Sequence, residues 1–328
     1  MSGLKIGIVG ATGLVGQELV SIIERSNLAV DDLKLFASER SSGMLLNFRG
    51  CSIPVAELGE DDALDLNYMF FCVCPRVSER FVPILSERGI ICIDNSSKYR
   101  LQEDVPLVVP EINSRALENH RNVIANPNCS TIIALTALAP LHKAFTLRGF
   151  CASTYQAVSG AGKAGISALA NDLEGDSDLA IDTFGCRIAF NVVPKIGEIH
   201  ETGYSIEEQK MIDESRKILA RNNLRISAIC VRVPVIRAHS MSIFASFESP
   251  IDLSQAKSVL EQSGNIDFCG EEILPCPLDA SGKDLCKVGR LRADSFVENG
   301  LSMWVVGDQL RKGAALNAFQ IMLALENL

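Results

Sequence analysis

Cys129 has the surroundings most favourable for nucleophilic chemistry. It follows Asn126-Pro127-Asn128 and opens an apolar segment, Ser130 to Leu138, that is typical of a buried helix. At a helix start, the macrodipole and unpaired backbone N–H groups stabilise a thiolate, which lowers its pKa. The same N–H groups can stabilise an oxyanion formed by attack on a carbonyl. We therefore predict that Cys129 is a nucleophile, whereas the other cysteines lie within strands or scattered loops.

A glycine turn near the start of the chain predicts a dinucleotide site. Gly10-Ala11-Thr12-Gly13-Leu14-Val15-Gly16 lies between an apolar run, Leu4 to Val9, and a helical pattern. Glycines let the backbone approach a pyrophosphate, and a helix start offers N–H groups to it. A tight structural turn is the alternative. The residues expected to contact the cofactor are Gly10, Thr12, Gly13, Leu14 and Val15.

The loop after the second expected strand bears on the choice of nicotinamide cofactor. An acidic residue there binds a ribose 2′-hydroxyl, and a basic residue receives a 2′-phosphate. Glu39 argues for NAD, whereas the neighbouring cation and hydroxyl groups suit a phosphate. The residues expected at the phosphate are Ser38, Arg40 and Ser41. We therefore expect NADP, although a solvated polar turn would leave the choice open.

Two kinds of domain must position these residues. Apolar runs separated by turns and helices predict a parallel, doubly wound sheet of Rossmann type in an α/β domain. These runs are Leu4 to Val9, Leu33 to Ala37, Tyr68 to Val73 and Ile90 to Asp94. After Cys129, longer strands in succession predict an α+β catalytic domain with a mixed sheet. They are expected at Phe150 to Val158, Ile226 to Val235 and Met241 to Glu248.

The domain boundary is expected at residue 128. The NADP-binding domain would span residues 1–128 and be completed by the C-terminal helix 308–328, with the catalytic and dimerisation domain at 129–307. We find no Pro/Gly/Ser-rich linker between the halves and no internal repeat.

Composition narrows the possible partners and location. The chain has 328 residues, 47% of them hydrophobic, and a net charge of −9, which disfavours nucleic acid and anionic membranes. Its apolar runs are shorter than the roughly 20 residues that span a bilayer, and its start lacks a secretory signal. Eleven cysteines, several in apolar runs, suggest reduced thiols. Without paired C-x-x-C knuckles and with four histidines, we expect no metal site and a cytoplasmic protein.

The order of several motifs resembles the aspartate-semialdehyde dehydrogenase family over nearly the whole chain. Besides the glycine turn, these motifs are Asp94-Asn95-Ser96-Ser97 leading to Arg100, Asn126 to Thr131, Gln156 to Gly162, Glu207 to Lys210, Arg232 to Val235 leading to His239-Ser240, and Leu310 to Asn317. The resemblance implies NADPH-dependent reduction of L-aspartyl 4-phosphate to the semialdehyde, in lysine, methionine, threonine and diaminopimelate biosynthesis. It also implies a homodimer, to which Gly165 to Thr183 and the rest of the second domain contribute.

The resemblance also implies roles for individual residues. Cys129 would form a thioester, Gln156 would orient it, and His239 would be the general acid/base. Arg232 would bind the substrate carboxylate in a bidentate manner. The remaining substrate contacts would be Glu208 for the α-ammonium group and Arg100, Asn128 and Lys210 for phosphate. Further cofactor contacts would be Ser159, Gly160 and Gln309.

One residue departs from the family pattern, which has glycine just before the histidine. This chain has Ala238, which is a small change if its φ is negative but costs about 1 kcal/mol or more if φ is positive.

Two other functions stay open. An N-acetyl-glutamyl-phosphate reductase uses related chemistry, but Ser130-Thr131 and a Glu208/Arg232 pair suit a free amino acid. A non-catalytic dinucleotide-binding sensor is disfavoured by the presence of Cys129, Gln156 and His239 together.

Overall fold

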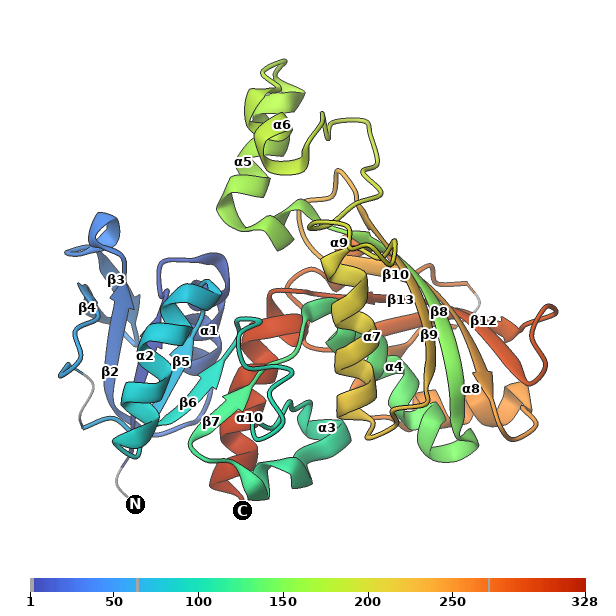
Figure 1. The fold of residues 1–328 in the computed structure, drawn as a ribbon, viewed down its shortest axis with the longest axis horizontal. Helices are drawn as coiled ribbons and strands as arrows, with labels where there is room; N and C mark the ends of the chain where they lie inside the picture. Colours follow the sequence, from blue (N-terminus) through green and yellow to red (C-terminus); the bar gives the residue numbers. More distant parts are fainter. Residues whose placement is uncertain (1–2, 63–64, 271) are drawn as a thin grey trace. The chain divides into compact units, whose positions relative to one another are not determined.

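In the computed structural model, residues 3–62, 65–270 and 272–328 are described. The chain divides into two units, residues 1–128 with 314–328 and residues 129–313 (Figure 1). We call them the nucleotide-binding unit and the catalytic unit, after the roles that the sequence predicts. Cys129 is the first residue of the catalytic unit.

The nucleotide-binding unit is built on a twisted sheet with the strand order β3-β4-β2-β1-β5-β6-β7 within the described residues. All neighbouring strands are parallel except the β3–β4 hairpin. The strands are β1 (Leu4–Val9), β2 (Val30–Ala37), β3 (Leu45–Phe48), β4 (Cys51–Glu57), β5 (Tyr68–Phe71), β6 (Ile91–Asp94) and β7 (Val123–Ala125). Strands β2 to β4 lie on one side of β1, and after β4 the chain crosses to place β5 on the other side of β1. Such a switch point is where doubly wound sheets bind nucleotides.

Helices cover this sheet. They are α1 (Leu14–Arg25), α2 (Pro75–Glu87), α3 (Pro110–Asn113) and α10 (Leu316–Glu326), with short 3-10 turns η1 (Glu39–Ser41) and η2 (Ser114–Asn119). Helix α1 buries Leu19, Val20 and Ile23 on one face, and α10 packs beside it and against β6. This arrangement confirms the expected doubly wound sheet. The C-terminal return begins at Ala314, later than the expected residue 308, because Asp308 and Gln309 bond within the catalytic unit.

The catalytic unit contains a mixed sheet with the order β11-β12-β13-β10-β8-β9 within the described part of the chain. Its strands are β8 (Leu147–Gln156), β9 (Arg225–Arg232), β10 (His239–Phe247), β11 (Ile266–Phe268), β12 (Cys286–Ala293) and β13 (Gly300–Gly307). Pairs β8–β9 and β11–β12 are parallel, and the others are antiparallel. The expected mixed sheet is therefore confirmed.

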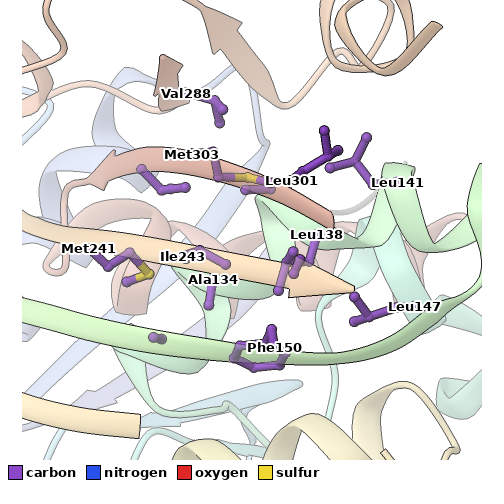
Figure 2. Packing of buried hydrophobic residues seen from close by; sticks show 14 of the residues in the cluster. Ala134, Leu138, Leu141, Leu147, Phe150, Met241, Ile243, Val288, Leu301 and Met303 are labelled. Carbon is purple, nitrogen blue, oxygen red and sulfur yellow. The ribbon is translucent and has the colours of Figure 1, made fainter. Parts of the chain in front are cut away.

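The core of this unit lies between the inner face of the sheet and helix α4 (Cys129–Phe145). Figure 2 shows Ala134 and Leu138 of α4 meeting Phe150 of β8 and Met241 and Ile243 of β10. The other helical elements are η3 (Val158–Ala161), α5 (Gly162–Leu173), α6 (Asp178–Phe184), α7 (Ile206–Ile218), α8 (Leu253–Glu261), α9 (Pro277–Ala280) and the π-helical turn η4 (Arg311–Ala315). This core fixes the start of α4, and with it Cys129.

Candidate active site

Three strand ends place polar side chains on one face of the catalytic sheet. The β8–β9 register pairs Gln156 with Arg232, and the β8–β10 register places His239 beside Gln156. Alternate residues of a strand share a face, and these three follow the buried, inward-facing positions of their strands. All three are buried. The sheet register therefore places an amide, a guanidinium and an imidazole together, at the same end of three neighbouring strands.

Gly160 makes room for two of these groups. A Cβ atom at residue 160 would lie 2.6 Å from Arg232 Nη1 and 3.4 Å from His239 Nε2. Arg232 Nη1 donates a hydrogen bond of 2.7 Å to Ala157 O, while Nε has no hydrogen-bond partner within the described residues. Burial lowers the pKa of Arg232, and Glu207 and Cys129 act in the opposite direction. Arg232 therefore stays cationic within electrostatic range of the Cys129 sulfur.

His239 has a defined neutral form. Its Nδ1 accepts a 3.0 Å hydrogen bond from Ala157 N, so the neutral ring carries its proton at Nε2. Burial, followed by the charge of Arg232, holds its pKa well below the usual value. The imidazole is fully buried. At neutral pH, His239 is thus an uncharged hydrogen-bond donor at Nε2.

The residue before this histidine is strained. Ala238 has φ +72°, in the left-handed region that favours glycine, so the departure from the family pattern costs about 1 kcal/mol. Its methyl group is fully buried and packs with Ala280 and Val306. Burying a methyl contributes about 0.8 kcal/mol, which offsets much of the strain.

A buried carboxylate joins Gln156 to α7. Glu207 Oε1 accepts from Gln156 Nε2 at 3.5 Å, and Glu207 Oε2 accepts from Lys210 Nζ at 3.2 Å. Gln156 Nε2 also donates to Thr154 Oγ1 at 3.2 Å. One turn of helix separates the carboxylate from the ammonium group. Glu207 and Lys210 therefore present opposite charges beside Gln156.

Glu208, by contrast, is occupied by the backbone. Its Oε2 accepts from Ser205 N at 2.7 Å, completing a capping box at the start of α7, and its Oε1 accepts from Cys230 N at 2.8 Å. Each oxygen of the Glu208 carboxylate therefore accepts a backbone hydrogen bond within the protein.

In the nucleotide-binding unit, the glycine turn is shaped by backbone. Gly10 has φ +83°, and a Cβ there would lie 2.3 Å from Cys72 O. A Cβ at Gly16 would lie 2.2 Å from Gly10 O, so glycine lets α1 pack close to the turn. Gly13 is the N-cap of α1, with no side-chain cap. The helix start therefore offers N–H groups where a pyrophosphate would bind.

The loops after β1 and β2 meet in this unit. Thr12 Oγ1 donates to Ser41 Oγ at 3.3 Å, which brings together two of the expected cofactor residues. Ser38 is the N-cap of η1, and Arg40 within η1 is exposed. Leu14 and Val15 form the first turn of α1. Hydroxyl groups and one cation thus surround the end of β2.

Asparagine side chains fix the turn before Cys129. Asn126 Nδ2 donates to Asn95 Oδ1 at 2.8 Å and to Ala314 O at 3.2 Å, and Asn126 Oδ1 accepts from Asn317 Nδ2 at 2.6 Å. Arg100 Nη2 donates to Asn95 O at 2.7 Å. Arg100 and Asn128 are both buried in this unit, whereas Lys210 belongs to the catalytic unit.

Comparison with known proteins identifies the family. Residues 5–120 match the model described as semialdehyde dehydrogenase, NAD binding domain, and residues 138–312 match semialdehyde dehydrogenase, dimerisation domain. Aspartate-semialdehyde dehydrogenase 2 of Vibrio cholerae is 41% identical over 323 residues, covering 97% of this chain and 96% of that protein. The chain belongs to the aspartate-semialdehyde dehydrogenase family.

Solved structures of aspartate semialdehyde dehydrogenases have folds similar to that of this chain. The crystal structure of aspartate semialdehyde dehydrogenase II from Vibrio cholerae complexed with ASA has a TM-score of 0.96 and 39% identity, covering 100% of this chain and 99% of that one. The Candida albicans aspartate semialdehyde dehydrogenase with NADP has a TM-score of 0.79 and 25% identity, covering 99% of each chain. Family membership confirms the resemblance, the fold class and the NAD(P)-dependent dehydrogenase class expected from the sequence.

The two adjacent glutamates on α7 differ in what they contact. The Glu208 oxygens accept backbone N–H groups, whereas the Glu207 oxygens accept from the side chains of Gln156 and Lys210. The signal in the sequence was the helical spacing, since Glu207 and Lys210 are three residues apart. Ser205 at the N-cap, three residues before Glu208, is likewise a capping-box pattern.

Sequence reasoning also gave Gly313 no role. A Cβ atom there would lie 2.9 Å from Cys129 Cβ, so only glycine leaves the cysteine its space. Ser159 and Gln309, expected at the cofactor, bond to each other: Gln309 Nε2 donates to Ser159 Oγ at 2.5 Å. No sequence spacing reveals either contact, because each joins residues more than 100 positions apart.

No disulfide joins the eleven cysteines, all of which lie in the described ranges. No group of three His, Cys, Asp or Glu residues in those ranges could hold a metal ion. Among the residues that the structure describes, no helix has the length and apolar character needed to cross a membrane.

Proposed function

We propose that this chain catalyses the NADP-dependent interconversion of L-aspartyl 4-phosphate and L-aspartate 4-semialdehyde, with phosphate as co-product. The observation that carries the proposal is the set of charges around Gln156: Arg232 for a carboxylate, and Glu207 for an ammonium group. Together these recognise a free α-amino acid. The related Vibrio cholerae and Candida albicans enzymes, whose solved structures hold ASA and NADP, support the same substrate and cofactor.

Cys129 is the proposed nucleophile. In the biosynthetic direction its thiolate attacks the C4 carbonyl of aspartyl phosphate, phosphate leaves, and a thioester remains on the sulfur. N–H groups at the start of α4 and the His239 Nε2–H stabilise negative charge on the carbonyl oxygen. Bound NADPH supplies the hydride that reduces the thioester. Cleavage of the C–S bond then releases the semialdehyde and restores the thiolate.

The proposed substrate contacts come from the catalytic sheet, from α7 and from the nucleotide-binding unit. Arg232, whose Nε has no hydrogen-bond partner among the described residues, binds the α-carboxylate, and Glu207 binds the α-ammonium. Gln156 orients the thioester without competing for protons. Arg100 and Asn128 of the nucleotide-binding unit and Lys210 of the catalytic unit are each proposed as phosphate ligands. His239 is the proposed general acid/base, with Nε2 on the side of Gly160 while Nδ1 accepts from Ala157 N.

The nucleotide-binding unit fits NADP. Its glycine turn leaves a cradle that a side chain would fill, and Thr12, Ser38, Arg40 and Ser41 line the end of β2 as donors for a 2′-phosphate. Gly10, Gly13, Leu14 and Val15 would contact the pyrophosphate.

We also infer a homodimer in the cytoplasm. The catalytic unit matches a dimerisation domain, and the outer face of its sheet exposes Tyr155, Ile229 and Phe244. Cysteines that form no disulfide among the described residues suit a reducing compartment. In this setting the enzyme would supply precursors of lysine, methionine, threonine and diaminopimelate.

One assay tests the proposal. Purified protein is incubated with aspartate semialdehyde, phosphate and NADP, and reduced cofactor is followed by absorbance. We expect a phosphate-dependent signal that Cys129→Ala lowers by roughly 10⁴-fold or more, while NADP binding persists. Faster reaction of N-acetylglutamate semialdehyde would favour the N-acetyl-glutamyl-phosphate reductase function. NADP binding without turnover of either substrate would favour a sensor.

A further inference from the structure

Ala238 is held in its left-handed conformation by one side chain. Its backbone N–H donates to Gln309 Oε1 at 2.8 Å. A residue with a Cβ atom leaves this region of φ unless contacts hold it there. The hydrogen bond crosses from the β9–β10 loop to the segment after β13, so it joins parts of the sheet that are distant in sequence.

The Gln309 side chain is itself fixed. Its Nε2 donates to Ser159 Oγ at 2.5 Å, and the Ser159 hydroxyl donates to Ile236 O. Ser159 N donates to the same carbonyl at 3.3 Å. Gln309 is 2% exposed. The amide therefore bridges the residues on either side of Arg237, and it can do so only in one orientation because Oε1 must accept and Nε2 must donate.

The adjacent residue strengthens this bridge. Asp308 Oδ2 accepts from Arg237 Nε at 2.7 Å and from Gly282 N at 2.6 Å. Two consecutive residues after β13 thus bind two consecutive residues before His239. The next peptide begins β10, where His239 Nδ1 accepts from Ala157 N.

We propose that Gln309 is a positioning residue: by holding Ala238 left-handed, it orients the His239 imidazole toward Gly160 and Arg232. A change of φ at residue 238 rotates the peptide that carries His239, which would break the Nδ1 contact with Ala157. The catalytic consequence rests on the proposed function of His239. The positioning itself does not, and the two can be measured separately.

This assignment differs from a direct contact between Gln309 and the cofactor. Glycine populates left-handed φ without the penalty that alanine carries. If Gln309 positions His239, Ala238→Gly lessens the need for it. If Gln309 binds the cofactor directly, glycine at residue 238 cannot replace the lost contact.

A double-mutant cycle tests the proposal with the intact enzyme. Gln309→Leu removes the amide at similar size, Ala238→Gly removes the strain, and the double variant combines them. Gln262→Leu is the matched control, because Gln262 lies on the exposed end of α8, where its Nε2 binds Ser258 Oγ at 2.9 Å. The readouts are kcat, the KM for aspartate semialdehyde, the Kd for NADP, and ¹⁵N NMR of labelled histidine.

The kinetic pattern is specific. Gln309→Leu should lower kcat by roughly 10²-fold, as expected for a misplaced catalytic group, with little change in the Kd for NADP. Ala238→Gly alone and Gln262→Leu should stay near wild type. In the Gln309→Leu background, Ala238→Gly should restore kcat by roughly 5- to 30-fold. No loss in Gln309→Leu, or a loss that glycine does not relieve, would overturn the proposal.

NMR gives the readout that needs no turnover. Four histidines give few signals, and His239→Asn assigns the one of interest. The Nδ1 and Nε2 shifts should move in Gln309→Leu and return in the double variant; unchanged shifts in Gln309→Leu would contradict the proposal. An inactive wild type with this NMR pattern would refute the proposed function but keep the positioning role. If Gln309→Leu does not fold, Gln309→Asn withdraws the acceptor by one methylene and must give the same pattern.

Discussion

The nucleotide-binding unit forms its candidate site from backbone, whereas the catalytic unit forms its own from side chains. At Gly10 and Gly16, the atoms nearest a missing Cβ are main-chain carbonyl oxygens. At Gly160, they belong to Arg232 and His239. Main-chain atoms beside a glycine cannot move without disturbing the sheet, whereas a neighbouring side chain can rotate away. The two sites should therefore respond differently to the same added methyl group.

Alanine at residues 10 and 160 tests this difference most directly. Gly10→Ala combines φ +83° with a Cβ placed 2.3 Å from Cys72 O, so we expect a loss of about 2–4 kcal/mol in the free energy of unfolding and weak NADP binding. Gly160→Ala meets the Arg232 Nη1 atom instead, so stability should change by less than about 1 kcal/mol while KM for the semialdehyde rises roughly ten-fold.

Urea unfolding and steady-state kinetics of both variants provide the measurements. Gly43→Ala is a matched control for positive φ, since nothing lies within 4 Å of its missing Cβ. Equal losses of stability for Gly10→Ala and Gly160→Ala would break the comparison.

Within the catalytic unit, we expect Glu207 to contribute to substrate binding and the adjacent Glu208 to contribute to stability. Glu207→Gln removes the charge proposed to bind the ammonium group, so KM for aspartate semialdehyde should rise by roughly 10²-fold with little loss of stability. Glu208→Gln weakens the acceptors for Ser205 N and Cys230 N, so it should cost about 1–2 kcal/mol in unfolding free energy with KM nearly unchanged. Steady-state kinetics and urea unfolding of Glu207→Gln and Glu208→Gln measure both effects. The reverse pattern would return the ammonium site to Glu208.

These cases show what a sequence can convey about each unit. The glycine turn is predictable because its function depends on local residues: strand, glycines and helix are contiguous. The same holds for Cys129, whose helix start is local. The identities of Gln156, Arg232 and His239 depended on family motifs, because a strand register joins residues more than 70 positions apart. Small strands such as β3 and β7 were not predicted, since three or four residues carry too little alternation.

Other features of the candidate site cannot be predicted from the sequence, because they depend on side-chain directions and on tertiary contacts. Glu207 and Glu208 have the same chemistry and adjacent positions, and only the direction of each side chain distinguishes a site from a cap. The sign of φ at Ala238 and the contact of Gly313 with Cys129 follow from tertiary packing. The family pattern singles out residue 238, but only the backbone conformation in the structure gives the sign of its φ.

The loop after β2 offers a smaller test of the nucleotide-binding unit. Arg40 is exposed and free to meet a 2′-phosphate, so Arg40→Ala should raise KM for NADP roughly ten-fold and leave that for NAD unchanged. Glu39→Ala is the adjacent control and should instead leave KM for NADP the same or lower. Kinetics with each cofactor give the ratio; an equal effect on both cofactors would remove Arg40 from the phosphate site.

The two units also differ in how much a buried histidine affects the pH dependence of stability. The pKa of His239 is well below its usual value because burial and Arg232 disfavour the charged ring. The unfolded chain therefore binds the proton first as pH falls through about 6.5. The free energy of unfolding should decrease on acidification, by up to about 1.4 kcal/mol per pH unit from this one group.

His239→Asn should remove that slope between about pH 5 and 6.5. His120 of the nucleotide-binding unit also has a lowered pKa, caused by burial alone, but it is only partly buried. His120→Asn should therefore flatten the curve less. Urea unfolding across this range measures both variants against wild type. Equal slopes in wild type and His239→Asn would mean that the imidazole accepts a proton in the folded enzyme as readily as in the unfolded chain, and its role as a neutral Nε2 donor would fail.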